Sequence, residues 1–373
     1  MEECIQRFRG RRRLNADNQK FFDAYLFLGG VDTGQRQFGG MDAAELRDLT
    51  PAERRSATAT DTIHTAGNTN ERFYNHNQPE KWNVDFYRVA AGFFSETVPV
   101  LAGSLDGYTE AVNTIEHFLR YVNQHDVCPE YDDDIKRTMA LCRIAREELP
   151  LITELPADMP GLFHLAAMKR FCEDDDNMYL PADKLPDGFD ADIFFKTTVI
   201  LAGSPSEADA LEATPNPKII RQYKADLELV DFEHPHDDLV RVFEGMQLNP
   251  PKGPRGIIPP VGKAIFKACV IEDGWYRPHQ PDPKTQPDLT LFFDASLLKM
   301  FKRGLRFRFL LCELDIGLTF VRKVFGVFPT FHSFLPQHLM KGYKEPVLNQ
   351  RPAPSVLDLD AEERQLANEC KDL

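Results

Sequence analysis

The chain has 373 residues, 42% of them hydrophobic and 27% charged, with a formal net charge of −14, which is ordinary for a globular protein of about two or three domains. Its seven cysteines are an odd number and include no Cys-x-x-Cys pair, which argues against a disulfide framework or a structural zinc site and for a reducing compartment. No uncharged stretch approaches the roughly 18 residues of a membrane span, so we expect no membrane partner.

The first part of the chain predicts helices. Its start, MEECIQRFRGRRR, lies inside an expected helix and lacks the apolar core of a signal peptide, which suggests a piece of a longer protein. Asn15 or Asp17 is expected to cap an aromatic-rich helix. Thr50 and Glu53 have the spacing of a capping box and predict another helix start.

Residues 121–137, YVNQHDVCPEYDDDIKR, predict a joint between two helices. Apolar residues recur at spacings of three and four on both sides, which indicates amphipathic helices at 107–124 and 132–149. His125 ends the first helix, Cys128 is a small residue that a tight joint can bury, and Pro129 cannot continue a helix. Asp132 is expected to be the N-cap of the second helix.

A metal site is the alternative interpretation of the same stretch, because His, Cys, Asp and Glu side chains can all bind metal. It would make the protein a metal-dependent enzyme, although neighbours in a turn tend to diverge rather than converge on one point. The ligand candidates are His125, Asp126, Cys128 and Glu130, with His234 and His236 further on.

From residue 190 the patterns favour strands. DIFFKTTVILAG (192–203) and KIIRQYKADLELVDF (218–232) are rich in strand-forming residues, with a small helix expected at 205–213 between them. Pro235 favours a helix cap over a ligand role for its two histidine neighbours. Asp273-Gly274 between apolar runs predicts a β-hairpin, and DIG (315–317) a second turn.

These elements predict an α+β fold, with a mainly helical N-terminal half followed by a mixed, mostly antiparallel, β-rich C-terminal half. We expect three regions. They are a helical region at 1–176 that contains the αα-hairpin, an α+β region with basic C-terminal strands at 190–345, and an acidic tail at 346–373.

Charge is unevenly distributed along the chain. Residues 130–249 hold 26 Asp and Glu against 12 Lys and Arg, whereas residues 252–351 hold 8 against 16. In LRFRFLL, arginines alternate with Leu and Phe, so one strand face should be core and the other basic. We expect a surface for RNA or for an acidic partner face, with Arg306, Arg308, Arg322 and Lys323 largely exposed. The candidate contacts are Lys299, Lys302, Arg303, Arg306, Arg308, Arg322 and Lys323.

Signatures of nucleotide-binding, metalloprotease, hydrolase and kinase sites are missing from the sequence, and no Cys or Ser has an obviously paired base. The sequence therefore indicates no catalysis and no cofactor.

Three blocks resemble one known family. FFDAYLFLGGVDTGQRQFGG (21–40), WNVDFYRVAAGFFS (82–95) and FLRYVNQHDVCPEYDDDI (118–135) are similar to the fungal family of the Argonaute-binding subunit of the Argonaute siRNA chaperone (ARC) complex. The blocks span about the first 150 residues in family order. The long lysine-rich N-terminal region associated with such proteins is missing here.

The resemblance implies partners rather than a reaction. In that family the subunit pairs with a second chaperone subunit and holds Argonaute loaded with double-stranded siRNA. It restrains slicing and passenger-strand release, and it serves RNA-directed heterochromatin assembly, which implies a place in nucleus and cytoplasm. The family offers no catalytic residues to carry over.

Overall fold

The computed structural model describes residues 1–11, 14–31, 83–172, 189–245, 259–275 and 283–342, with short pieces at 33, 50–51, 53, 73–74, 185, 247–248 and 256–257. Residues 1–335 belong to one compact unit. A second unit begins at Pro336, and its described part is helix α14 (Pro336–Gly342). The expected acidic tail at 346–373 lies outside the described residues.

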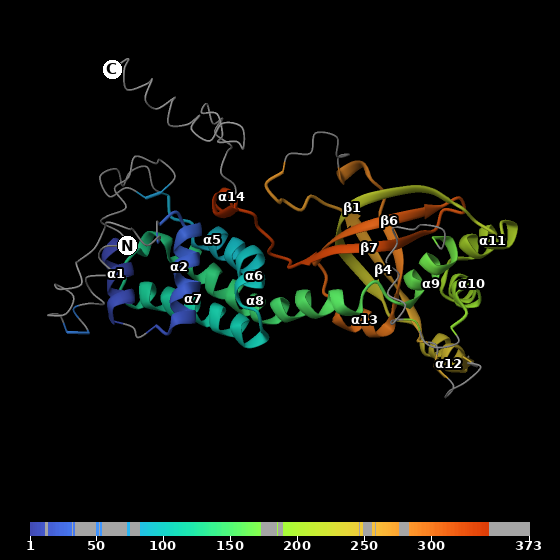
Figure 1. Cartoon of the computed structure of the whole chain (residues 1–373), viewed down its shortest axis with the longest axis horizontal. Coiled ribbons are helices and arrows are strands. Elements are labelled where there is room, and N and C mark those ends of the chain that lie inside the picture. The colour runs from blue at the N-terminus through green and yellow to red at the C-terminus, as the bar shows by residue number, and fades with distance from the viewer. Residues whose placement is uncertain are drawn as a thin grey trace, which may run out of the picture. The chain divides into compact units, whose positions relative to one another are not determined.

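Helices form the described N-terminal half (Figure 1). In chain order they are α1 (Glu2–Arg11), α2 (Ala16–Leu28), α5 (Phe86–Gly92), a π-helical turn (Phe93–Thr97), α6 (Val98–Leu101), α7 (Leu105–Gln124), a 3₁₀ turn (Pro129–Tyr131), α8 (Asp132–Asp158) and α9 (Leu162–Phe171). None of the helices in the described part is long and apolar enough to cross a bilayer.

Capping explains where several of these helices begin. The Asn15 side chain accepts a hydrogen bond from the Asn18 N–H at 2.7 Å, which confirms it as the N-cap of α2. Thr50 and Glu53 exchange both bonds of the predicted capping box. The core that these helices share is aromatic: Phe8, Phe22 and Phe118 pack with ring centroids 4.9–5.3 Å apart.

The C-terminal half combines a sheet with short helices. Its elements are α10 (Ala191–Ala202), α11 (Pro205–Ala213), β1 (Ile219–Glu233), α12 (Asp237–Gly245), β2 (Gln247–Leu248), β3 (Gly256–Ile257), β4 (Val261–Ala268), a 3₁₀ turn (Pro283–Thr285), β5 (Leu289–Asp294), α13 (Ala295–Met300), β6 (Arg306–Leu314) and β7 (Thr319–Phe328). Five strands pair antiparallel in the order β5-β4-β1-β6-β7. The predicted α+β class is confirmed.

Two local predictions in this half were wrong. Residues 192–202 are helical, because Asp190 caps α10 at the Ile193 N–H and the apolar residues bury one helical face. Asp273-Gly274 is not a tight hairpin turn: β4 and β5 do pair antiparallel, but β4 ends at Ala268 and β5 begins only at Leu289. The second turn was correct, and Gly317 adopts the left-handed φ of 78° between β6 and β7.

Helix α9 packs against both edge strands of the sheet, β5 and β7. Its His164 accepts a hydrogen bond at Nδ1 from the Val321 N–H on β7, and the ring lies 4.9 Å from that of Phe293 on β5. Asp294, at the end of β5, accepts from the Leu162 N–H at 2.9 Å and so caps α9. The helix thus covers strand edges that would otherwise present unpaired backbone groups.

Both side chains have shifted pKa values because they are buried. Burial lowers the pKa of His164 to about 3, so the imidazole is neutral in the fold. Burial also raises the pKa of Asp294 to about 6, although its hydrogen bond from Leu162 acts in the opposite direction.

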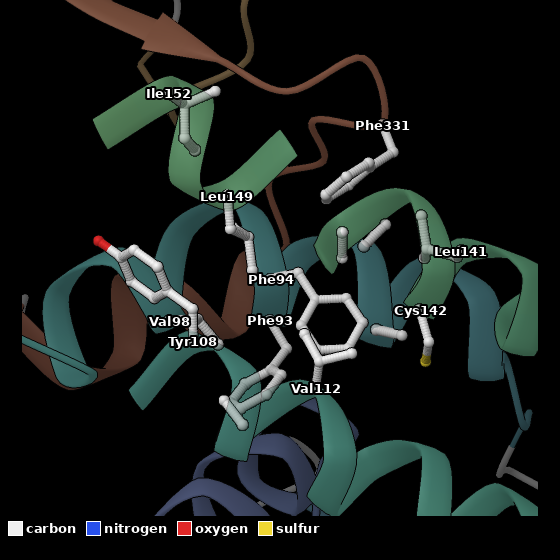
Figure 2. Packing of buried hydrophobic residues seen from close by; sticks show 14 of the residues in the cluster. Phe93, Phe94, Val98, Tyr108, Val112, Leu141, Cys142, Leu149, Ile152 and Phe331 are labelled. Atoms are coloured by element: carbon white, nitrogen blue, oxygen red, sulfur yellow. The ribbon is translucent and has the colours of Figure 1, made fainter. Parts of the chain in front are cut away.

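The segment after β7 returns to the helices. Thr330 donates its N–H to the buried Glu148 carboxylate at 2.8 Å, and His332 lies 2.6 Å from Glu96. Phe331 joins the buried cluster near Phe94, as Figure 2 shows. The segment 329–335 is called the return segment below.

Candidate partner-binding surface

The joint between α7 and α8 is a tight turn. His125 follows the last residue of α7, and its ring packs 4.4 Å from that of Tyr121. Asp126 has a positive φ of 48°, and Cys128 is buried before the 3₁₀ turn that opens with Pro129. Packing and backbone geometry thus account for the places of His125, Asp126 and Cys128 in the joint.

Asp132 is not the N-cap that we expected. The cap position belongs to Tyr131, because the 3₁₀ turn runs directly into α8, and Asp132 instead pairs with Lys136 at 2.5 Å on the exposed surface. The carboxylate with a structural role is Asp134, which accepts from the Phe86 N–H at 2.7 Å and the Tyr87 N–H at 3.4 Å. The acidic triplet thus supplies a cap to another helix, α5.

Replacing Asp134 with alanine is expected to lower the free energy of unfolding by about 1 to 2 kcal/mol, since two N–H groups at the start of α5 lose their acceptor. Asp132→Ala is the matched control and should cost no more than about 0.5 kcal/mol, because its ion pair is exposed. Urea unfolding of the two variants measures this difference. A larger loss for Asp132→Ala would show that the cap assignment above is wrong.

The proposed metal ligands do not converge. Within the described ranges, no group of three or more His, Cys, Asp or Glu side chains is placed to hold a metal ion. His125, Asp126 and Glu130 point to solvent while Cys128 is buried. His234 and His236 are exposed between β1 and α12, where the chain turns at Pro235.

Most of the predicted basic residues already have acidic partners. Lys302 lies 2.9 Å from the buried Glu148 and 3.1 Å from Glu147. Burial lowers the pKa of Lys302, but its hydrogen bonds to these glutamates outweigh that effect and raise it. Arg303 pairs with Asp231 at 2.6 Å, and Arg306 lies 3.7 Å from Glu228. These cations contribute little net charge to the surface.

Arg308 is the centre of an ion network on the outer face of the sheet. It binds the buried Asp226 with two nitrogens, at 2.7 and 3.0 Å, and Asp273 at 2.8 Å. It also donates to the Ile271 carbonyl at 3.0 Å. The network therefore ties the loop of residues 269–275, here called the Trp275 loop, to the sheet.

The expectation that the four strand cations are largely exposed was wrong for three of them. The side chains of Arg306 and Arg308 are only 26% and 17% exposed, because each folds onto an acidic neighbour. Arg322 is partly covered and donates to Gln222 on β1. Lys323 is exposed, as expected. Lys299, on α13, is also exposed.

Two lysines on this face lie beside one aromatic ring. Lys224 of β1 and Lys323 of β7 both lie opposite Leu310 of the strand between them, so the three form one row across the sheet. Their ammonium groups lie 4.9 and 5.3 Å from the centroid of Phe325, which is 41% exposed. We call Lys224, Lys323 and Phe325 the lysine-phenylalanine patch.

Comparison with known proteins assigns the chain to a family. The sequence model of the Argonaute siRNA chaperone (ARC) complex subunit Arb1 matches residues 1–346. The chain belongs to this family. Argonaute-binding protein 1 of Schizosaccharomyces pombe (strain 972 / ATCC 24843) is 32% identical over 165 residues, which are 43% of this chain and 38% of that protein. The aligned part is thus well under two thirds of the yeast protein. No solved structure matches the chain.

Lys224 was missed as a candidate in the sequence of this Arb1 family member. It lies in the acidic block of the chain, among Asp226 and Glu228, where a lone lysine has no distinctive signal. Only the pairing of β1 with β6 places it beside cations that are about a hundred residues away. Alternation along β1, combined with a correct guess of the strand order, would have been needed to find it.

Proposed function

We propose that this chain is a non-catalytic Argonaute-binding chaperone subunit. The observation that carries the proposal is the match of residues 1–346 to the Arb1 family, which covers nearly the whole sequence. The yeast relative, named for binding Argonaute, supports the same partner.

A non-catalytic role agrees with the positions of two buried groups whose pKa values are shifted. His164, whose pKa burial depresses, accepts a backbone hydrogen bond at a strand edge. Asp294, whose pKa burial raises, caps a helix. Buried groups with perturbed pKa values are candidates for catalysis when they line a cleft. These two instead support the contact between α9 and the sheet.

The finer role that we propose follows the family resemblance. With a second ARC subunit, the chain holds Argonaute loaded with double-stranded siRNA, and it restrains slicing and passenger-strand release. It acts in small-RNA loading and RNA-directed heterochromatin silencing, in nucleus and cytoplasm. A protein that binds one state of Argonaute more tightly than another shifts the population toward that state, which is how binding alone can delay release of a strand.

Co-purification tests the partner. The chain carrying an affinity tag should retain Argonaute from the same organism both before and after RNase treatment, because the contact is with protein. If capture disappears after RNase treatment, RNA bridges the two proteins and the chain does not bind Argonaute directly. Failure to capture Argonaute under either condition would refute the proposed function.

A strand-release assay tests the finer role. Argonaute loaded with a labelled siRNA duplex should release the passenger strand more slowly when the chain and its second subunit are added. An unchanged release rate, with Argonaute still bound, would mean that the chain binds Argonaute but does not restrain release of the passenger strand.

A further inference from the structure

We propose that the lysine-phenylalanine patch and the Trp275 loop together form the surface that docks an acidic protein segment carrying an apolar anchor side chain. This inference rests on the proposed function, since the partner that supplies the segment is Argonaute. It goes further by naming the surface and the chemistry that recognises it.

Unbalanced charge is the first observation. Arg303, Arg306 and Arg308, and Lys302 beside them, each have an acidic neighbour within 4 Å. Among the described residues, no carboxylate pairs with Lys224 or Lys323, although both are exposed and lie in one row of the same sheet face. Two lysines of one row that no described carboxylate compensates fit a partner that brings the counter-charge.

The second observation is apolar surface held on a rigid support. Trp275 is 71% exposed, and its backbone N–H donates to Asp273 at 3.2 Å. Asp273 in turn binds Arg308, so the indole is presented two residues from an anchored ion pair. Gly274 provides the left-handed turn between them, with a φ of 80°. Tryptophan held in this way is typical of a residue that contributes much of the binding energy at a protein interface.

The strand register brings the two features together. Asp226, Arg308 and Gly326 form one row across β1, β6 and β7, and Lys224, Leu310 and Lys323 form the next row on the same face. The Trp275 loop is bound to Asp226 and Arg308 of the first row, which is the row next to the two lysines. Val270, in the same loop, is 52% exposed and extends the apolar surface.

A protein segment fits this surface better than RNA does. Affinity for nucleic acid depends on how many phosphates a surface neutralises, whereas this row offers two lysines without a described carboxylate partner, on a chain whose net charge is −14. A base would also have to compete with two ammonium groups for the ring of Phe325. Two lysines next to an exposed Trp and Phe match a short peptide with carboxylates beside an apolar side chain.

The affinity of purified Argonaute for the full chain, measured by biolayer interferometry, tests the inference. Trp275→Ala should weaken binding about thirtyfold, as expected of a hot-spot residue. The double variant K224E/K323E should weaken it about tenfold at low salt and less at high salt. The control R143E/R241E reverses two exposed arginines on α8 and α12, with the same change in net charge, and should bind like the wild type.

The outcomes separate the inference from the proposed function. Wild-type chain that does not bind Argonaute refutes the proposed function and this inference with it. Wild-type binding with unchanged affinity in both variants refutes the inference alone. Equal weakening in the control would mean that net charge, and not the patch, is recognised. A labelled siRNA duplex is the second probe: if K224E/K323E loses duplex binding and keeps Argonaute affinity, the surface is one for RNA and the inference is wrong.

Discussion

Replacing Glu148 with alanine is expected to lower the free energy of unfolding by about 3 kcal/mol, since it removes a buried acceptor that serves an ammonium group, a backbone N–H and a hydroxyl. Glu148 is completely buried on α8, where it accepts from Lys302 before β6 and from both the N–H and the hydroxyl of Thr330 after β7. Its loss would leave the Thr330 N–H and hydroxyl without their acceptor, whereas Lys302 would keep Glu147 as a partner. Equilibrium unfolding in urea measures the change.

Glu147 is the natural control for this prediction. It lies next to Glu148 and pairs with the same lysine at 3.1 Å, but its side chain is 71% exposed. Glu147→Ala should therefore cost no more than about 1 kcal/mol. Similar losses for the two variants would show that burial does not set the strength of this contact.

Acid is expected to destabilise the protein through His164. Its folded pKa of about 3 lies below the ordinary value of 6.5, so the unfolded chain binds the extra proton first as the pH falls. The stabilisation is complete above the unfolded pKa and is lost progressively from about pH 6.5 toward 3. By pH 5 the loss amounts to about 2 kcal/mol.

His164→Asn tests this, because the asparagine oxygen can still accept from the Val321 N–H without titrating. The variant should be less stable at pH 7 through lost packing, yet its stability should fall less between pH 7 and 5. Asp294 titrates in the opposite sense: its raised pKa makes the fold gain stability as the pH falls from about 6 toward 4. Asp294→Asn should therefore steepen the acid loss. Equal pH slopes in the wild type and His164→Asn would disprove the role of His164.

Periodicity in the sequence predicted much of the fold. Helices α7 and α8 lie where the apolar spacing of three and four indicated, and β6 follows its alternating arginines. The strand prediction for residues 192–203 was wrong because Val, Ile and Phe favour strands in isolation. In the fold, one face of helix α10 packs its phenylalanines beside α9. Tertiary context overrode local propensity.

The candidate surface was only partly predictable. The sequence indicated that Arg306 and Arg308 share a face, but it could not indicate that Asp226 and Glu228 lie opposite them on β1. Strand order decides which cations are neutralised, and strand order is a property of the folded chain. The strand order also places Lys224 in the candidate surface and makes Arg308 a support for the Trp275 loop.

The return segment has a consequence for how the protein is made. The helical cluster around Phe94 is completed by Phe331, which is synthesised more than two hundred residues later (Figure 2). Until the end of β7 leaves the ribosome, the N-terminal helices carry an apolar gap where that ring belongs and an unpaired glutamate at position 148. A nascent chain in that condition exposes the kind of surface that chaperones bind. We therefore expect a stop codon shortly before residue 329 to yield aggregated protein, and not a soluble helical fragment.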